Sequence, residues 1–174
     1  MKYVYVTIKI PVYGYFDHSG GDTMPACTFF GHHDCPDSVK PLIRSALTDL
    51  IEQHAVDVFY VGRQGAFDRM VHAVLKELQS LYPHICYAVV LERLPAKADA
   101  YPAFSPVETL FPEGLESVPP RFAISQRNRW MLQQSDYVMT YITHPWGGAA
   151  QYAALAAKQK KQIISLAPNA RPQN

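Results

Sequence analysis

Three glycine-bearing turns carry most of the polar side chains that could bind a ligand. They are GHHD at residues 31–34, GRQG at 62–65 and THPWGG at 143–148. Glycine tolerates positive φ and lets backbone amides approach an anion closely, as a phosphate group requires. The alternative is that these glycines serve only tight strand-to-helix turns. We predict that the turns bind a ligand through Gly31, His32, His33, Gly62, Arg63, Gly65, Gly147 and Gly148.

Three further residues lie where they could hold a phosphate or a sugar. Arg127 could pair with phosphate oxygens, because a guanidinium binds them in bidentate fashion and this arginine lies at the start of a predicted helix. The amide of Asn128 can both accept from and donate to hydroxyl groups. Asp68 could bind a ribose hydroxyl, or could interact with the first turn of its own helix. Both Arg63 and Arg127 could instead be solvated surface charges.

No motif for metal binding or nucleophilic catalysis accompanies these residues. His32 and His33 are adjacent and lack an HExxH or HxH pattern, and His144 is isolated, so we expect no metal site. The chain has neither a Ser-His-Asp order nor a GxSxG turn. A full GxGxxG is also missing, which argues against an NAD-dependent dehydrogenase. Catalytic residues therefore stay unassigned, and no particular cofactor is implied.

The composition favours one globular domain over residues 1–174. The chain has 48% hydrophobic and 18% charged residues, enough to bury a core without metals or disulfides. Its 16 basic and 15 acidic residues create no broad positive field, so we do not expect it to bind nucleic acid. Because no apolar run approaches about 20 residues and no signal peptide is evident, we expect a cytoplasmic protein without a membrane partner. The three cysteines lack CxxC spacing and are expected to be buried thiols.

Apolar runs alternate with amphipathic segments from residue 26 onward. We predict strands over residues 26–30, 56–61, 85–91, 137–142 and 162–166, and helices over 37–54, 67–81, 125–134 and 148–159. Strands buried on both faces and joined by helices indicate a mostly parallel sheet. The predicted fold is therefore a doubly wound, Rossmann-like α/β domain in three layers. It has five or six strands and helices on both faces.

Two segments fall outside this alternation. Residues 1–23 are expected to be an N-terminal strand extension, with the strand itself at residues 3–10. Residues 93–120 are proline-rich and predict an insertion or lid, with one helical turn near residues 106–110. In a doubly wound sheet, ligands bind at the carboxyl ends of the strands, so the three glycine-bearing turns should meet at one edge.

The motifs CTFFGHHDCP, VGRQGAFDRM, SQRNRWMLQQSD and GGAAQYAALAA resemble the YpsA-like branch of the SLOG superfamily. This Rossmann-like superfamily includes the LONELY GUY phosphoribohydrolases and the DNA-processing protein DprA. The resemblance covers about residues 27–166 and implies a pocket for a nucleotide-like ligand. The positions that it assigns to the pocket are Gly31, His32, Gly62, Gly65, Asp68, Arg127, Asn128, Gly147 and Gly148.

The sequence departs from this family pattern at three positions. His33 stands where the branch tends to have arginine, and Ala66 stands where the pattern places glycine before Phe67. The phosphoribohydrolases use a glutamate in a PGGxGTxxE motif, and the matching position here is Ala154. General acid–base assistance is worth about 10²–10⁴-fold in rate, and alanine cannot provide it. The chain is therefore not expected to be a phosphoribohydrolase of the ordinary kind.

The sequence favours binding or sensing of a nucleotide or a nucleotide-derived phosphorylated ligand. The alternative is a hydrolase acting on the N-glycosidic or phosphate bond of such a ligand. In that case Glu92, Asp34 or Asp68 would supply the carboxylate beside Arg127. Both hypotheses use the same pocket. They differ in whether a carboxylate in that pocket transfers a proton to or from the ligand.

A third hypothesis is an interaction protein. The aromatic residues Tyr101, Phe104 and Phe111 could form a docking surface, or could pack into the core. We also expect a homodimer or higher oligomer, since members of the broader group commonly self-associate and the N-terminal strand offers an edge for pairing.

Overall fold

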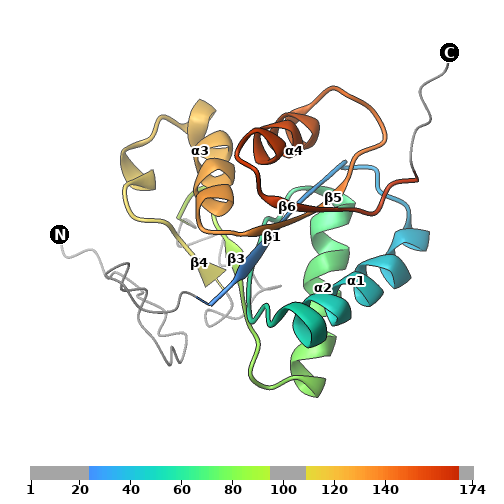
Figure 1. The fold of residues 1–174 in the computed structure, drawn as a ribbon. Helices are drawn as coiled ribbons and strands as arrows, with labels where there is room; N and C mark the ends of the chain where they lie inside the picture. Colours follow the sequence, from blue (N-terminus) through green and yellow to red (C-terminus); the bar gives the residue numbers. More distant parts are fainter. Residues whose placement is uncertain (1–23, 95–108, 169–174) are drawn as a thin grey trace, which may run out of the picture.

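A six-stranded sheet organises the computed structural model, which describes residues 24–94 and 109–168 (Figure 1). The strand order is β4-β3-β2-β1-β5-β6, and every pairing is parallel. The strands are β1 (Ala26–Gly31), β2 (Val58–Val61), β3 (Cys86–Val90), β4 (Thr109–Leu110), β5 (Tyr137–Tyr141) and β6 (Gln162–Ser165). The predicted Rossmann-like α/β fold is thereby confirmed.

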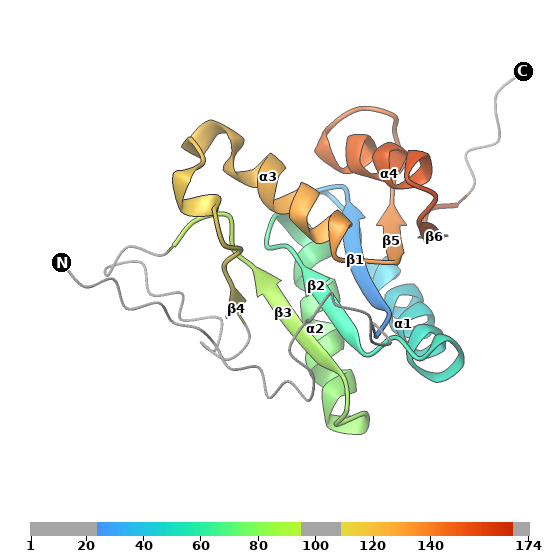
Figure 2. The same cartoon turned by 60° about the vertical axis from the view of Figure 1, so that its left-hand side comes forward.

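Four α-helices cover the two faces of the sheet, two on each face (Figures 1 and 2). They are α1 (Lys40–His54), α2 (Gly65–Leu81), α3 (Pro120–Gln133) and α4 (Gly148–Lys158). The first two pack on one face and the last two on the other. Right-handed crossovers explain this division, because the chain builds outward from β1 in one direction and from β5 in the other.

Both faces of the central strands are buried. On the side of α1 and α2, Phe59 of β2 packs in a large cluster that includes Leu47 and Val71. On the opposite side, the next residue, Tyr60, packs with Met131 of α3. This burial on both faces explains why the strands read as continuous apolar runs in the sequence.

The chain adds β2, β3 and β4 on one side of β1, and then adds β5 and β6 on its other side. Cys27 of β1 is in register with Tyr137 of β5, and β2 lies on the other side of β1. The connections after β1 and β5 therefore leave in opposite directions at their carboxyl ends. Such a switch point leaves a crevice that no crossing chain covers, and it is where doubly wound proteins bind ligands.

Helix α3 begins five residues earlier than predicted, at Pro120 instead of residue 125. The Pro119-Pro120 pair explains this start, because proline is favoured at the first position of a helix, where its missing N–H is not needed. Arg127 therefore lies in the middle of α3, and the prediction that it lies at the helix start was wrong.

The proline-rich segment contains regular structure that the sequence did not indicate. The helical turn predicted near residues 106–110 is wrong where the chain is described, because Thr109 and Leu110 form β4 beside Val89 and Val90. A 3₁₀ turn follows at Leu115–Ser117. The described residues do not include the predicted strand at residues 3–10, nor residues 106–108, Tyr101 and Phe104.

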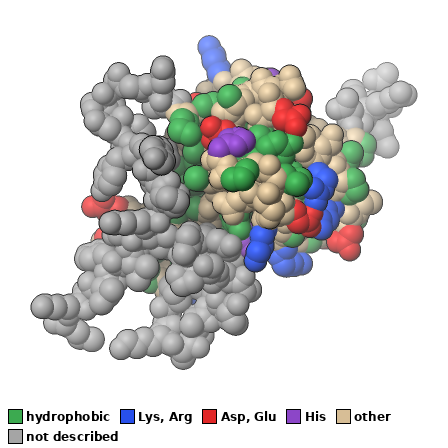
Figure 3. All heavy atoms as spheres, turned by 90° about the horizontal axis from the view of Figure 1, so that it is seen from below, with side chains coloured by type: hydrophobic (Ala, Val, Ile, Leu, Met, Phe, Trp, Pro, Cys, Tyr) green, Lys and Arg blue, Asp and Glu red, His purple; other side chains and the backbone are tan. Residues whose placement is uncertain are grey.

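The described surface in Figure 3 carries basic and acidic side chains interspersed with apolar ones, without a broad patch of one charge sign. None of the helices in residues 24–94 and 109–168 has the length and apolar content needed to cross a membrane.

Candidate functional site

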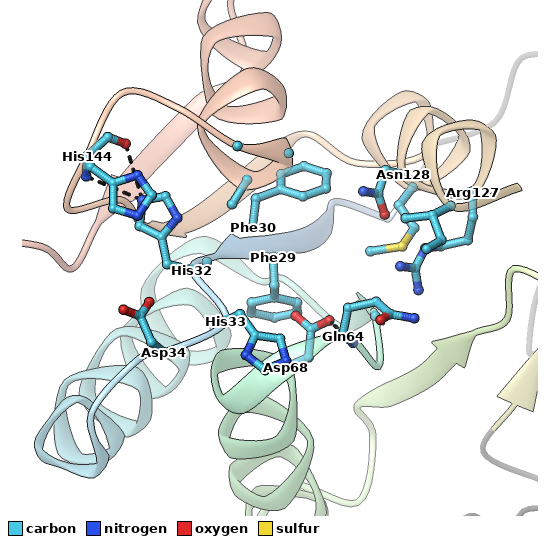
Figure 4. Close-up of a pocket in the computed structure, with 17 residues that line it drawn as sticks. Phe29, Phe30, His32, His33, Asp34, Gln64, Asp68, Arg127, Asn128 and His144 are labelled. Atoms are coloured by element: carbon cyan, nitrogen blue, oxygen red, sulfur yellow. Dashed lines mark hydrogen bonds between the residues drawn. The ribbon is translucent and has the colours of Figure 1, made fainter. Parts of the chain in front are cut away.

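A cavity of about 340 Å³ opens at the carboxyl ends of β1 and β2, at the switch point of the sheet (Figure 4). The turns after β1 and β2, the first turn of α4 and one side of α3 form its walls. Nine of the eleven predicted ligand-binding residues line it, namely Gly31, His32, His33, Gly62, Asp68, Arg127, Asn128, Gly147 and Gly148. The structure thus brings them together, and their binding of a ligand stays a prediction.

Arg63 and Gly65 do not line this cavity. Gly65 has a φ of +94°, and a Cβ there would lie 2.7 Å from the Cα of His33. The turn at the start of α2 therefore requires glycine for its own geometry. Arg63 is directed toward Glu92 and forms two hydrogen bonds with its carboxylate, one from Nε at 3.0 Å and one from Nη2.

The pair formed by Arg63 and Glu92 also removes one candidate catalytic carboxylate from the cavity. Glu92 lines a separate hollow near Leu115 and Pro120. Burial raises the pKa of Glu92, but the hydrogen bonds from Arg63 and its own amide, with the charges of Arg63 and Arg127, outweigh burial and lower the pKa overall. Of the proposed carboxylates, Asp68 and Asp34 line the cavity, and Asp34 is exposed.

Arg127 is almost completely buried, with 1% of its surface exposed. Its Nη1 donates a hydrogen bond to the carbonyl oxygen of Val90 at 2.9 Å, whereas its Nε has no hydrogen-bond partner among the described residues. Burial lowers the pKa of the guanidinium, while the charges of Asp68 and Glu92 oppose this effect. The cavity wall thus holds a desolvated cation with an unused donor, and the alternative of a solvated surface charge is wrong.

Asp68 is a buried carboxylate at the start of α2. Its Oδ2 accepts a hydrogen bond from the backbone amide of Gln64 at 2.8 Å, so it contacts the start of its own helix. Burial raises the pKa of Asp68 to about 6, while that hydrogen bond and the charge of Arg127 partly offset the effect. The side chains of Asp68 and Arg127 both approach the backbone of Gly62 closely. A Cβ at residue 62 would lie 2.4 Å from Asp68 Oδ2 and 3.2 Å from Arg127 Nη1.

The raised pKa of Asp68 predicts a pH dependence of stability. Because folding favours the neutral carboxyl, the contribution of Asp68 to the stability of the wild-type protein should decrease as the pH rises from about 4 through about 6. Asp68→Asn cannot titrate, so its stability relative to wild type should increase over this range. Urea unfolding at pH 4.5 and pH 7.5 measures the difference. A constant difference, or an NMR titration midpoint of Asp68 near 4, would contradict the prediction.

Two stacked imidazoles join the first turn to the third. The rings of His32 and His144 have centroids 3.6 Å apart, at 18° to each other. The Nε2 of His32 also lies within hydrogen-bond distance of the backbone amide and carbonyl of His144, at 3.3 and 3.2 Å. Burial lowers the pKa of His32, and the nearby His144 adds to this effect. These contacts hold the turn that leads into α4.

The start of α4 is the third wall of the cavity. Gly147 has a φ of +91°, and no side chain caps the helix. A Cβ at Gly147 or at Gly148 would have no neighbouring atom within 4 Å, apart from the adjacent residues and the helix backbone. The positive end of the helix dipole therefore has open space beside it, which suits an anion.

Several lining residues were missed from the sequence, namely Phe29, Phe30, Gln64, Ile124, Met131 and Ala149. His144 was treated as isolated, although it contributes to the wall. The Pro119-Pro120 pair was a usable signal for Ile124, since an earlier helix start extends α3 along the cavity. The stacking partner of His144 is 112 residues away in the sequence, and no local pattern indicates it.

The strand order and the cavity at the switch point define a Rossmann-like α/β protein. Among solved structures, the chain is similar to DNA processing protein A (DprA) from Streptococcus pneumoniae, with a TM-score of 0.55 and 14% sequence identity. The alignment covers 82% of this chain and 50% of the DprA chain, so this chain spans about half of that protein. The likeness shows the fold alone. Neither the protein-family models nor the curated proteins yield a match.

Proposed function

We propose that the cavity binds a nucleotide or a nucleotide-derived phosphorylated ligand. The observation that carries this proposal is one cavity walled by the uncapped start of α4 and by the buried guanidinium of Arg127. Both features favour negative charge, and Arg127 has an Nε donor without a partner among the described residues. We also propose that the chain belongs to the YpsA-like branch, which its sequence motifs resemble.

The residue types around the cavity suggest how the ligand would lie. A phosphate would accept hydrogen bonds from the backbone amides at Gly148 and Ala149, where the helix dipole favours negative charge. Asn128 and Asp68 offer an amide and a carboxylate to sugar hydroxyls.

Isothermal titration calorimetry with AMP, ADP, NAD and ADP-ribose tests the proposal, with inorganic phosphate as the minimal probe. Wild-type protein should bind at least one nucleotide. Gly148→Asp should weaken that binding at least about tenfold, because a carboxylate would occupy the start of α4, while the same charge stabilises the helix by about 0.3–1 kcal/mol. Folded wild-type protein that binds no member of the panel would contradict the proposal.

A second candidate function is hydrolysis of the N-glycosidic or phosphate bond of the same ligand. Asp68 favours it, since its pKa of about 6 suits a group that exchanges protons near neutral pH. Chromatography of the calorimetry samples would detect free base or phosphate. Product formation that is lost in Asp68→Asn would support catalysis, and unchanged ligand at high protein concentration would exclude it for that compound.

A further inference from the structure

Three aromatic rings form a column beside the cavity. The ring of His32 stacks on that of His144, and the ring of His144 stacks on the indole of Trp146, with centroids 4.3 Å apart and an angle of 17°. His32 is 5% exposed and Trp146 is 67% exposed, so the column runs from the protein interior to the surface. The first two members line the cavity (Figure 4), whereas Trp146 lies outside its lining, directly before Gly147.

Hydrogen bonds hold the column in place. The Nε2 of His32 contacts the backbone of His144, as described above. The Nδ1 of His144 lies 3.1 Å from the carbonyl oxygen of Trp146 and can donate to it in the Nδ1–H tautomer. Both histidines are therefore fixed by backbone contacts. The indole itself is held by its stacking contact with His144.

Among the residues that the structure describes, ring stacking covers one face of the indole. His144 covers that face, and an exposure of 67% leaves the other face to solvent. The neighbouring Gly147 and Gly148 have open space where a side chain would begin. A flat apolar surface thus lies outside the cavity lining, two residues before the first residue of α4.

We propose that Trp146 is the stacking platform for the aromatic base of the ligand. This inference rests on the proposed function. It narrows the class of ligand to compounds that carry an aromatic base, as opposed to sugar phosphates. Stacking on His144 already restricts the indole, so the side chain loses less conformational entropy when a base binds. Base stacking on an aromatic side chain accepts any base, so AMP and GMP should both bind.

Titrations of AMP and ribose 5-phosphate into Trp146→Ala test the platform, since ribose 5-phosphate has the same phosphate and sugar as AMP but a hydroxyl group in place of the base. The variant should weaken AMP binding about 5- to 100-fold and ribose 5-phosphate binding less than about twofold. Trp146→Phe should retain part of the AMP affinity, because it keeps a smaller aromatic face. Phe122→Ala is the matched control, since Phe122 is another exposed aromatic residue outside the cavity, and both affinities should stay unchanged.

Indole fluorescence gives a second readout. In a Trp130→Phe background, Trp146 is the remaining tryptophan, and AMP should change its emission more than ribose 5-phosphate does. Equal weakening of both ligands by Trp146→Ala, or AMP affinity retained within twofold, would overturn the platform while leaving the proposed function intact. If wild-type protein binds no nucleotide at all, the proposed function fails and this inference fails with it.

Discussion

Replacing Arg127 with methionine is expected to lower the free energy of unfolding by about 3–5 kcal/mol, because it removes one member of a buried charge cluster. Asp68 and Glu92 would lose a neighbouring cation, and the carbonyl oxygen of Val90 would lose its donor. Methionine has a similar length and retains much of the packing. The loss would therefore report the electrostatic and hydrogen-bonding role of Arg127 more than a cavity in the core.

Urea denaturation at neutral pH measures the effect of Arg127→Met. Arg129→Met is the matched control, because Arg129 lies on the same helix and is exposed, and its substitution should change stability by less than about 0.5 kcal/mol. Equal stability of Arg127→Met and wild type would show that the buried cation and its neighbours contribute no net stability. The same comparison at pH 5 should give a smaller loss, since Asp68 is then largely neutral.

Gly31→Ala is the second substitution with a large expected effect. A Cβ at residue 31 would lie 2.2 Å from Cγ of Phe67, which is fully buried in the first turn of α2. A densely packed interior resists such a displacement, and overpacking typically costs about 1–3 kcal/mol. We expect a loss at the upper end of that range, because the ring of Phe67 also stacks on Tyr141 and has little room to move.

Gly148→Ala provides the comparison for Gly31→Ala, since both add one methyl group at the cavity rim. A Cβ at residue 148 would meet no atom within 4 Å beyond its neighbours and its own helix, and alanine favours the helix by about 1 kcal/mol over glycine where the position is helical. Its stability should equal or exceed that of wild type. Thermal unfolding of the two variants measures the contrast, and similar losses in both would show that the contact with Phe67 is easily relieved.

Much of this architecture follows from local patterns in the sequence. Continuous apolar runs such as residues 26–30 and 137–142 predicted buried parallel strands, and the turns at Gly31, Gly62 and Gly147 marked where those strands end. The carboxyl ends of parallel strands share one edge, so the approximate position of the cavity could be predicted as well.

The chemistry of individual side chains was less predictable because it depends on distant partners. Arg63 and Glu92 are 29 residues apart, and their pairing directs Arg63 away from the cavity. Arg127 was expected at a helix start, but Pro120 begins the helix earlier and the guanidinium is buried. Neither outcome is encoded in periodicity or turn composition, since both require knowing which segments pack together.

The adjacency of β1 and β5 has a consequence for how the protein acquires its structure. The amide of Ala26 bonds to the carboxylate of Asp136, a partner 110 residues later in the chain. Contacts between such distant segments form slowly, because a long loop must close first. During synthesis, β1 stays an open edge until residues 137–141 have left the ribosome. Such an edge invites aggregation, and the cavity is still incomplete at that stage, because the wall contributed by α4 is translated later still.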